Sequence, residues 1–97
     1  MEICKMMTLS LDHISEKTIR FLEEAVESGE VVCYEKEGYG FWIFTNNYYD
    51  NIDAFRKNVP EDLFLLMGLS VAHGCDWLCL DVDGPIEEFL VTYGRSC

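Results

Sequence analysis

Apolar residues recur at helical spacing in two stretches of the chain. In residues 15–28 the apolar positions repeat every three or four residues, and glutamates occupy the opposite side. Ser15 is a favourable N-cap, and Gly29 stands where helices commonly end in a left-handed residue. We therefore predict a helix over residues 15–28.

A second helix is predicted from Pro60 to Gly74. Proline fits the first turn of a helix, and Glu61 and Asp62 place negative charge at the positive end of the helix dipole. For residues 52–58, which precede it, we expect a helical turn.

Strands are predicted where short runs of β-branched and aromatic residues are bounded by turn residues. These runs cover residues 3–9, 31–35, 39–45 and 76–81, and a further strand is expected within residues 86–93. Lys36, Glu37 and Gly38 form the turn of a hairpin between the second and third runs. Gly40 marks either a bulge or a close backbone approach.

The element order is β-α-β-β-α-β with a terminal strand, which predicts an α+β class and a single domain over residues 1–97. We expect a ferredoxin-like split βαβ arrangement, in which one antiparallel sheet carries two helices on one face. The last main strand then runs antiparallel beside the first strand. In that register Cys4 lies opposite Cys79.

The same arrangement brings His13, at the end of the first strand, close to His73 and Cys75, which lead into the last strand. Imidazole and thiolate together suit zinc, so these three residues are candidate ligands, with Asp12, Asp76 or water as the fourth. The alternative is that His73 lies at a helix C-terminus and that the cysteines are small apolar core residues. This spacing is much less specific than a CxxC pair.

The charge of the chain is strongly negative. Its 97 residues include 18 Asp and Glu against seven Lys and Arg, which gives a formal net charge of −11. This balance argues against direct binding of nucleic acid, because contacts to phosphate need clustered cations. It suits a basic protein partner, or solubility alone.

The N-terminus lacks the basic segment and apolar stretch of a signal peptide. The longest apolar run, residues 63–69, is far shorter than the ~20 residues of a membrane span. We therefore expect a soluble, cytoplasmic protein that binds no membrane, as a monomer or small homo-oligomer. Five cysteines without a signal peptide favour reduced thiols over a disulfide framework.

No sequence motif indicates catalysis. The chain has no GxSxG motif and no glycine-rich phosphate loop, and none of its cysteines lies in a local nucleophile signature. We therefore expect that it is not an enzyme.

The acidic residues suggest a partner-binding surface. Residues 58–94 contain no Lys or Arg but seven acidic residues. The simpler interpretation is a solvated acidic surface. The more specific interpretation is a surface that docks in a cationic groove. The candidate contact residues are Asp81, Asp83, Glu87 and Glu88, with Tyr48 and Tyr49 as exposed aromatic anchors.

Three segments of the chain carry a resemblance to known proteins. Residues 3–10 with His13, the hairpin over residues 34–40, and residues 73–81 resemble a family of small acidic proteins encoded on bacterial plasmids and phages. The chain is also similar to anti-CRISPR proteins of the type II-A class, which inhibit the RNA-guided nuclease of the host.

The resemblance implies a function of inhibition by binding. The protein would bind the RNA-guided DNA nuclease of type II CRISPR-Cas systems and block its engagement with target DNA. The family's usual ending differs from Pro85 and the tail Arg95-Ser96-Cys97, so no role of the tail is implied. The alternative is a small zinc-binding structural or regulatory module of a mobile genetic element, without inhibitory activity.

Overall fold

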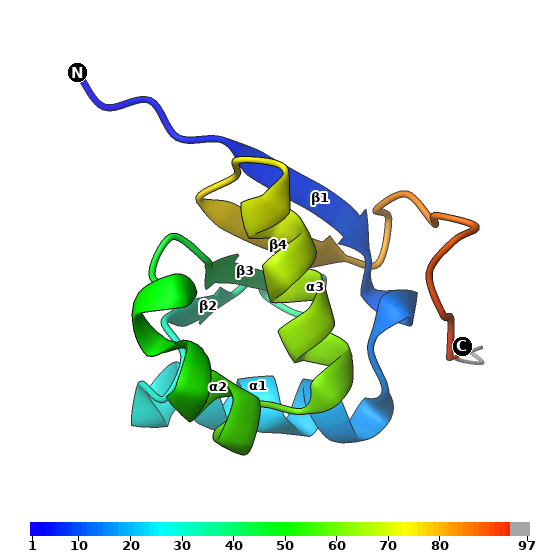
Figure 1. Ribbon diagram of the computed structural model, residues 1–97. Helices are drawn as coiled ribbons and strands as arrows, with labels where there is room; N and C mark the ends of the chain where they lie inside the picture. Colours follow the sequence, from blue (N-terminus) through cyan, green and yellow to red (C-terminus); the bar gives the residue numbers. More distant parts are fainter. Residues whose placement is uncertain (94–97) are drawn as a thin grey trace.

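A computed structural model gives the fold of the protein and describes residues 1–93 (Figure 1). Within these residues the chain forms a small α+β domain, which confirms the predicted class. Its elements, in chain order, are β1 (Met6–Ser10), a 3-10 turn (Leu11–His13), α1 (Glu16–Ser28), β2 (Cys33–Glu35), β3 (Gly40–Phe44), a 3-10 turn (Tyr49–Asn51), α2 (Ile52–Asn58), α3 (Glu61–Ala72) and β4 (Trp77–Asp81).

The four strands form one mixed sheet in the order β1-β4-β3-β2. The β1 and β4 strands are parallel, whereas β4 with β3 and β3 with β2 are antiparallel. The expectation of a purely antiparallel, ferredoxin-like sheet is therefore wrong. The residue opposite Cys79 is Thr8, not Cys4.

The α2 helix explains the difference in topology. In a split βαβ fold one helix carries the chain from one end of the sheet to the other before the last strand. Here α2 and α3 follow each other, and the chain returns to the end of the sheet that it left. Consequently β4 begins where β3 ends, with Trp77 beside Phe44, and runs parallel to β1.

The α1 helix matches its prediction closely. The Ser15 hydroxyl accepts the backbone N–H of Thr18 at the N-cap, and Gly29 ends the helix with a φ of 78°. Asp62 of α3 accepts the backbone N–H of Ser15 at 2.9 Å and the hydroxyl of Thr18 at 2.6 Å. This carboxylate therefore joins the first turns of α1 and α3.

The helices cover one face of the sheet. Figure 1 shows α3 across that face, with α1 and α2 below it. Strand residues that point toward the helices are largely buried in a single hydrophobic core: Leu9, Cys33, Phe41, Ile43, Leu78 and Leu80, with Met7 partly buried beside them. The helices contribute Leu22, Ala25, Phe55, Leu63, Leu66 and Met67.

Gly40 confirms one of its two predicted roles, a close backbone approach. It has a φ of 154°, and a Cβ at this position would overlap the backbone carbonyl of Leu80. Only glycine fits this contact between β3 and β4.

Residues 82–93 contain no strand, so the expected strand within residues 86–93 is not formed. This C-terminal segment instead packs on the end of β1. The Pro85 carbonyl accepts the N–H of Ser10 at 2.8 Å, and the Asp12 carbonyl accepts the N–H of Tyr93 at 2.9 Å. The tail Arg95-Ser96-Cys97 lies outside the described residues.

None of the helices in residues 1–93 is long and apolar enough to cross a membrane.

Candidate functional site

The face of the sheet turned away from the helices is the candidate site. The register of the strands places two rows of side chains on this face, and each row runs across neighbouring strands. We call this surface the open face, and it consists of Met6, Thr8, Tyr34, Trp42, Phe44, Trp77 and Cys79. No helix of the described residues covers it (Figure 1).

The open face is apolar because the two central strands are apolar on both sides. Residues 41–44 read Phe-Trp-Ile-Phe, and residues 77–80 read Trp-Leu-Cys-Leu. Continuous apolar runs are typical of strands that are buried on both faces of a sheet. Here the helices bury only one face, so within residues 1–93 the second face lacks a cover.

Aromatic rings on the open face contact one another. The Trp77 ring lies 5.1 Å from Phe44 in an edge-on arrangement and 6.2 Å from Tyr34, measured between centroids. Tyr34 is 55% exposed and Met6 is 47% exposed. Together with Trp42, Trp77 and Cys4, these two residues line a shallow hollow of about 290 Å³.

An ion pair borders the aromatic surface. The Lys36 ammonium donates a hydrogen bond to the Asp81 carboxylate, and its nitrogen lies 5.2 Å from the centroid of the Trp42 ring. This hydrogen bond lowers the pKa of Asp81 and raises the pKa of Lys36. Asp81 is therefore neutralised within the fold and is a poor candidate for steering a partner.

The cysteines at the sheet have the properties of structural thiols. Cys79 is 2% exposed although it lies on the open face, and burial raises its pKa. Cys33, on the helix side, has a pKa raised to about 11 by burial. A reactive cysteine needs a lowered pKa and access, and these two have neither.

Some acidic side chains form hydrogen bonds within the fold, and others lie at the surface. Asp62 and Asp76 make hydrogen bonds that hold the fold; Asp76 accepts from the Asn46 side chain and the Lys5 backbone, which lowers its pKa. Asp83 and Glu88 are exposed, and Glu87 is half-buried. Of the four acidic residues predicted for partner binding, Asp83, Glu87 and Glu88 are thus placed to contribute net charge at a surface.

The two predicted aromatic anchors differ in exposure. Tyr48 is only 6% exposed, and its ring packs against Phe64 at a centroid distance of 5.2 Å. The expectation that Tyr48 is exposed is therefore wrong; burial also raises the pKa of its phenol. Tyr49 is 66% exposed, but it lies in the 3-10 turn before α2, away from the open face.

His13 is buried and joins the C-terminal segment to the rest of the domain. Its Nε2 accepts the backbone N–H of Glu87 at 3.1 Å, so Nδ1 carries the proton and donates it to the Val91 carbonyl at 2.8 Å. Both ring nitrogens are used by the fold, and neither is free for a metal.

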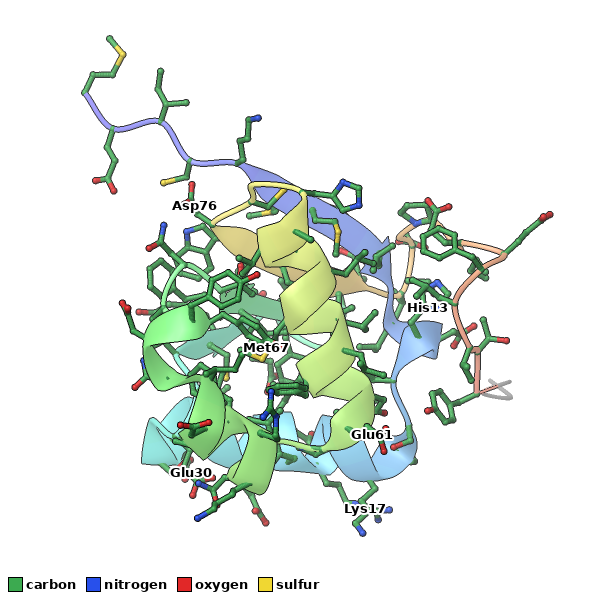
Figure 2. All side chains as sticks on the ribbon, in the orientation of Figure 1. His13, Lys17, Glu30, Glu61, Met67 and Asp76 are labelled. Atoms are coloured by element: carbon green, nitrogen blue, oxygen red, sulfur yellow. The ribbon has the colours of Figure 1, made fainter. Side chains whose placement is uncertain are left out.

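The structure separates the three predicted zinc ligands. His13 follows the end of β1, whereas His73 and Cys75 precede the start of β4. These strands are parallel, so the two groups lie at opposite ends of a five-residue strand pair, about 16 Å apart at the usual rise per residue. In Figure 2, His13 and Asp76, which directly follows Cys75, likewise lie at opposite ends of this strand pair.

Among the described residues, no group of three or more His, Cys, Asp or Glu side chains is arranged to hold a metal. Zinc binding itself stays a prediction, and elemental analysis of protein purified without added metal tests it.

The sequence prediction missed the open face. Its signal was present in the apolar runs of residues 41–44 and 77–80, where no polar residue alternates with the core residues. With one side of each strand assigned to the core, the other side carries Trp42, Phe44 and Trp77 and needs an explanation.

Fold and surface together define a small α+β domain with one uncovered aromatic sheet face. Residues 6–95 match the model of the family described as "Family of unknown function (DUF5983) C-terminal domain", and the chain belongs to this family. Comparisons with curated proteins and with solved structures gave no match.

Proposed function

We propose that the protein acts by binding another protein through the open face, without catalysing a reaction. The observation that supports this proposal is the pair of two-sided apolar strands, β3 and β4, that are covered on one side only. Clustered exposed aromatic residues are typical of protein interfaces, where they supply much of the binding energy.

The charge of the protein favours a basic partner. With a formal net charge of −11, two copies of the chain repel each other, whereas a cationic surface is attracted. The specific partner that we propose is the RNA-guided nuclease of a type II CRISPR-Cas system. This choice rests on the resemblance described above and on the positively charged channels in which such a nuclease holds nucleic acid.

A cleavage assay tests the proposed partner. Plasmid cleavage by the purified nuclease–guide complex is measured with increasing amounts of the protein, and co-elution of the two is measured by gel filtration. We expect cleavage to fall as the protein is added. Undiminished cleavage at a large molar excess, together with separate elution, would overturn the inhibitor proposal.

Two tyrosine variants test the proposed surface. Tyr34 on the open face and Tyr49 before α2 are 55% and 66% exposed, so Tyr34→Ala and Tyr49→Ala remove the same group from different surfaces. We expect Tyr34→Ala to weaken inhibition about tenfold, the scale of a moderate aromatic hot spot. Tyr49→Ala should leave inhibition unchanged; the reverse pattern would place the interface on the helix side.

A further inference from the structure

The β1 strand forms an edge of the sheet, and part of its outer side is unpaired. The carbonyl of Lys5 accepts N–H groups from the β4 side, at 2.8 Å from Asp76 and 3.1 Å from Trp77. Backbone groups alternate along a strand, so Met6 and Thr8 direct their N–H and C=O groups outward. Among the described residues these outward groups have no hydrogen-bond partner.

Within residues 1–93, the outer side of β1 is hydrogen-bonded only at its end. Ser10 also faces outward, and its N–H is bonded to the Pro85 carbonyl at 2.8 Å. Gly84 permits this contact, because a Cβ there would collide with the backbone of Leu9. The C-terminal segment therefore closes the edge at Ser10 and leaves the preceding residues open.

Apolar hollows lie on both sides of this open edge. The hollow of about 290 Å³ on the open face includes Met6 and Trp77. A second hollow of about 380 Å³ lies on the helix side, and its lining includes Met7, Leu69 and Phe89. A strand added beside β1 directs alternate side chains to the two sides of the sheet.

We infer that β1 binds an extended peptide segment of the partner, which adds to the sheet as a fifth strand. Main-chain hydrogen bonds to Met6 and Thr8 would hold the segment, and its alternate apolar side chains would fill the two hollows. This inference rests on the proposed binding function and names the form in which the partner is recognised.

The charge around the open edge indicates which residue types the peptide carries at its ends. Glu87 lines the helix-side hollow, and Glu2 and Asp76 line a neighbouring hollow beside the start of the edge. Lys5, just before β1, is the only Lys or Arg within residues 1–10. The peptide is therefore expected to carry Lys or Arg at its ends, and a second copy of this acidic chain is disfavoured.

A peptide library tests the inference without the nuclease. The probe is a set of capped peptides Lys-Thr-X-X-X-Thr-Lys, in which neighbouring X residues point to opposite sides of the sheet and X is Val, Ile, Leu, Phe, Tyr or Trp. Binding to the full chain is measured by fluorescence polarisation. We expect a subset to bind and to protect the Met6 and Thr8 amides from hydrogen exchange. Replacing both lysines by glutamate should weaken binding at least about tenfold.

A matched pair of variants distinguishes the contribution of the Thr8 backbone to peptide binding from that of its side chain. Thr8→Pro removes the outward N–H at an edge position where proline is tolerated, whereas Thr8→Ala keeps it. We expect Thr8→Pro to abolish peptide binding and Thr8→Ala to preserve it. Should Thr8→Pro unfold, peptides N-methylated on alternate residues test the same hydrogen bonds from the other partner, and one of the two methylation patterns should abolish binding.

The outcomes distinguish this inference from the proposed function. No binding by any library member, or equal binding by both Thr8 variants, would overturn strand addition while leaving the result of the nuclease assay unaffected. Concentration-dependent dimers in ultracentrifugation that Thr8→Pro abolishes would also overturn it, because a second copy would then be the occupant of the edge.

Discussion

His13 shows how one buried side chain can hold a segment that has no regular structure. Residues 82–93 lack strands and helices, and their attachment depends on backbone contacts to Ser10 and Asp12 and on the two ring nitrogens of His13. Only the neutral imidazole with its proton on Nδ1 satisfies both the Val91 carbonyl and the Glu87 N–H.

Loss of this side chain should destabilise the domain. His13→Ala leaves a buried donor and a buried acceptor unpaired, so we expect the free energy of unfolding to fall by about 2–3 kcal/mol. Urea denaturation measures the loss, and faster exchange of the Glu87 amide locates it. His73→Ala is the matched control, because His73 is exposed, and it should change little. Equal losses would show that His13 has no special role.

The ion pair between Lys36 and Asp81 predicts a pH dependence. Hydrogen bonds hold the pKa values of Asp81 and Asp76 below the ordinary value of about 3.9. Their contributions to stability are complete above that ordinary value and are lost as the pH falls through the lowered values. Lys36→Met should therefore flatten the acid limb of a stability profile measured between about pH 5 and pH 2. A limb as steep as that of the wild type would contradict the pairing.

At the level of elements, the sequence predicted most of the helices and strands but not their arrangement. Helix 15–28 and the hairpin were predictable because caps, turn residues and periodicity agree locally. The topology depended on α2, a seven-residue helix whose sequence has weak local signals. Because the prediction gave this segment only a helical turn, it assigned the opposite direction to β4. This error placed His13 next to His73 and Cys75.

The candidate site was only partly predictable for the same reason. Exposure of Tyr48 or Asp81 depends on neighbours far along the chain, such as Phe64 and Lys36, and periodicity carries no information about them. The apolar second side of β3 and β4 is visible in the sequence. That no helix within residues 1–93 covers it is a property of the tertiary structure.

The contact of Asp62 with the start of α1 is the one between elements that a mutation tests best. Asp62→Ala removes the acceptor of the Ser15 N–H and of the Thr18 hydroxyl, so we expect a loss of about 1–3 kcal/mol in stability. This loss corresponds to a fall in Tm of several degrees at the usual ~4–8 °C per kcal/mol for a domain of this size. Glu61→Ala, at the exposed neighbouring position, is the control and should stay within about 0.5 kcal/mol.

For the whole molecule, charge and aromatic surface should act on different steps of binding. Asp83, Glu87 and Glu88 attract a basic partner over distances up to the Debye length of ~8 Å, and the open face supplies short-range contacts. Long-range charge mainly changes association rates, whereas a lost anchor mainly changes dissociation rates.

Kinetics with the nuclease–guide complex separate the two effects. Asp83→Lys with Glu88→Lys should slow association and flatten its salt dependence, and Tyr34→Ala should instead speed dissociation. Surface plasmon resonance at two salt concentrations measures both rates. Identical salt slopes for the wild type and the double variant would show that these acidic residues do not face the partner.

The two tryptophans of the chain, Trp42 and Trp77, both lie on the open face, so their signals report on that surface alone. The protein labelled with 5-fluorotryptophan is mixed with the unlabelled nuclease–guide complex, and its ¹⁹F NMR spectrum is recorded. We predict that both resonances shift or broaden as the complex forms. Two unchanged resonances in a complex that co-elutes would contradict binding through the open face.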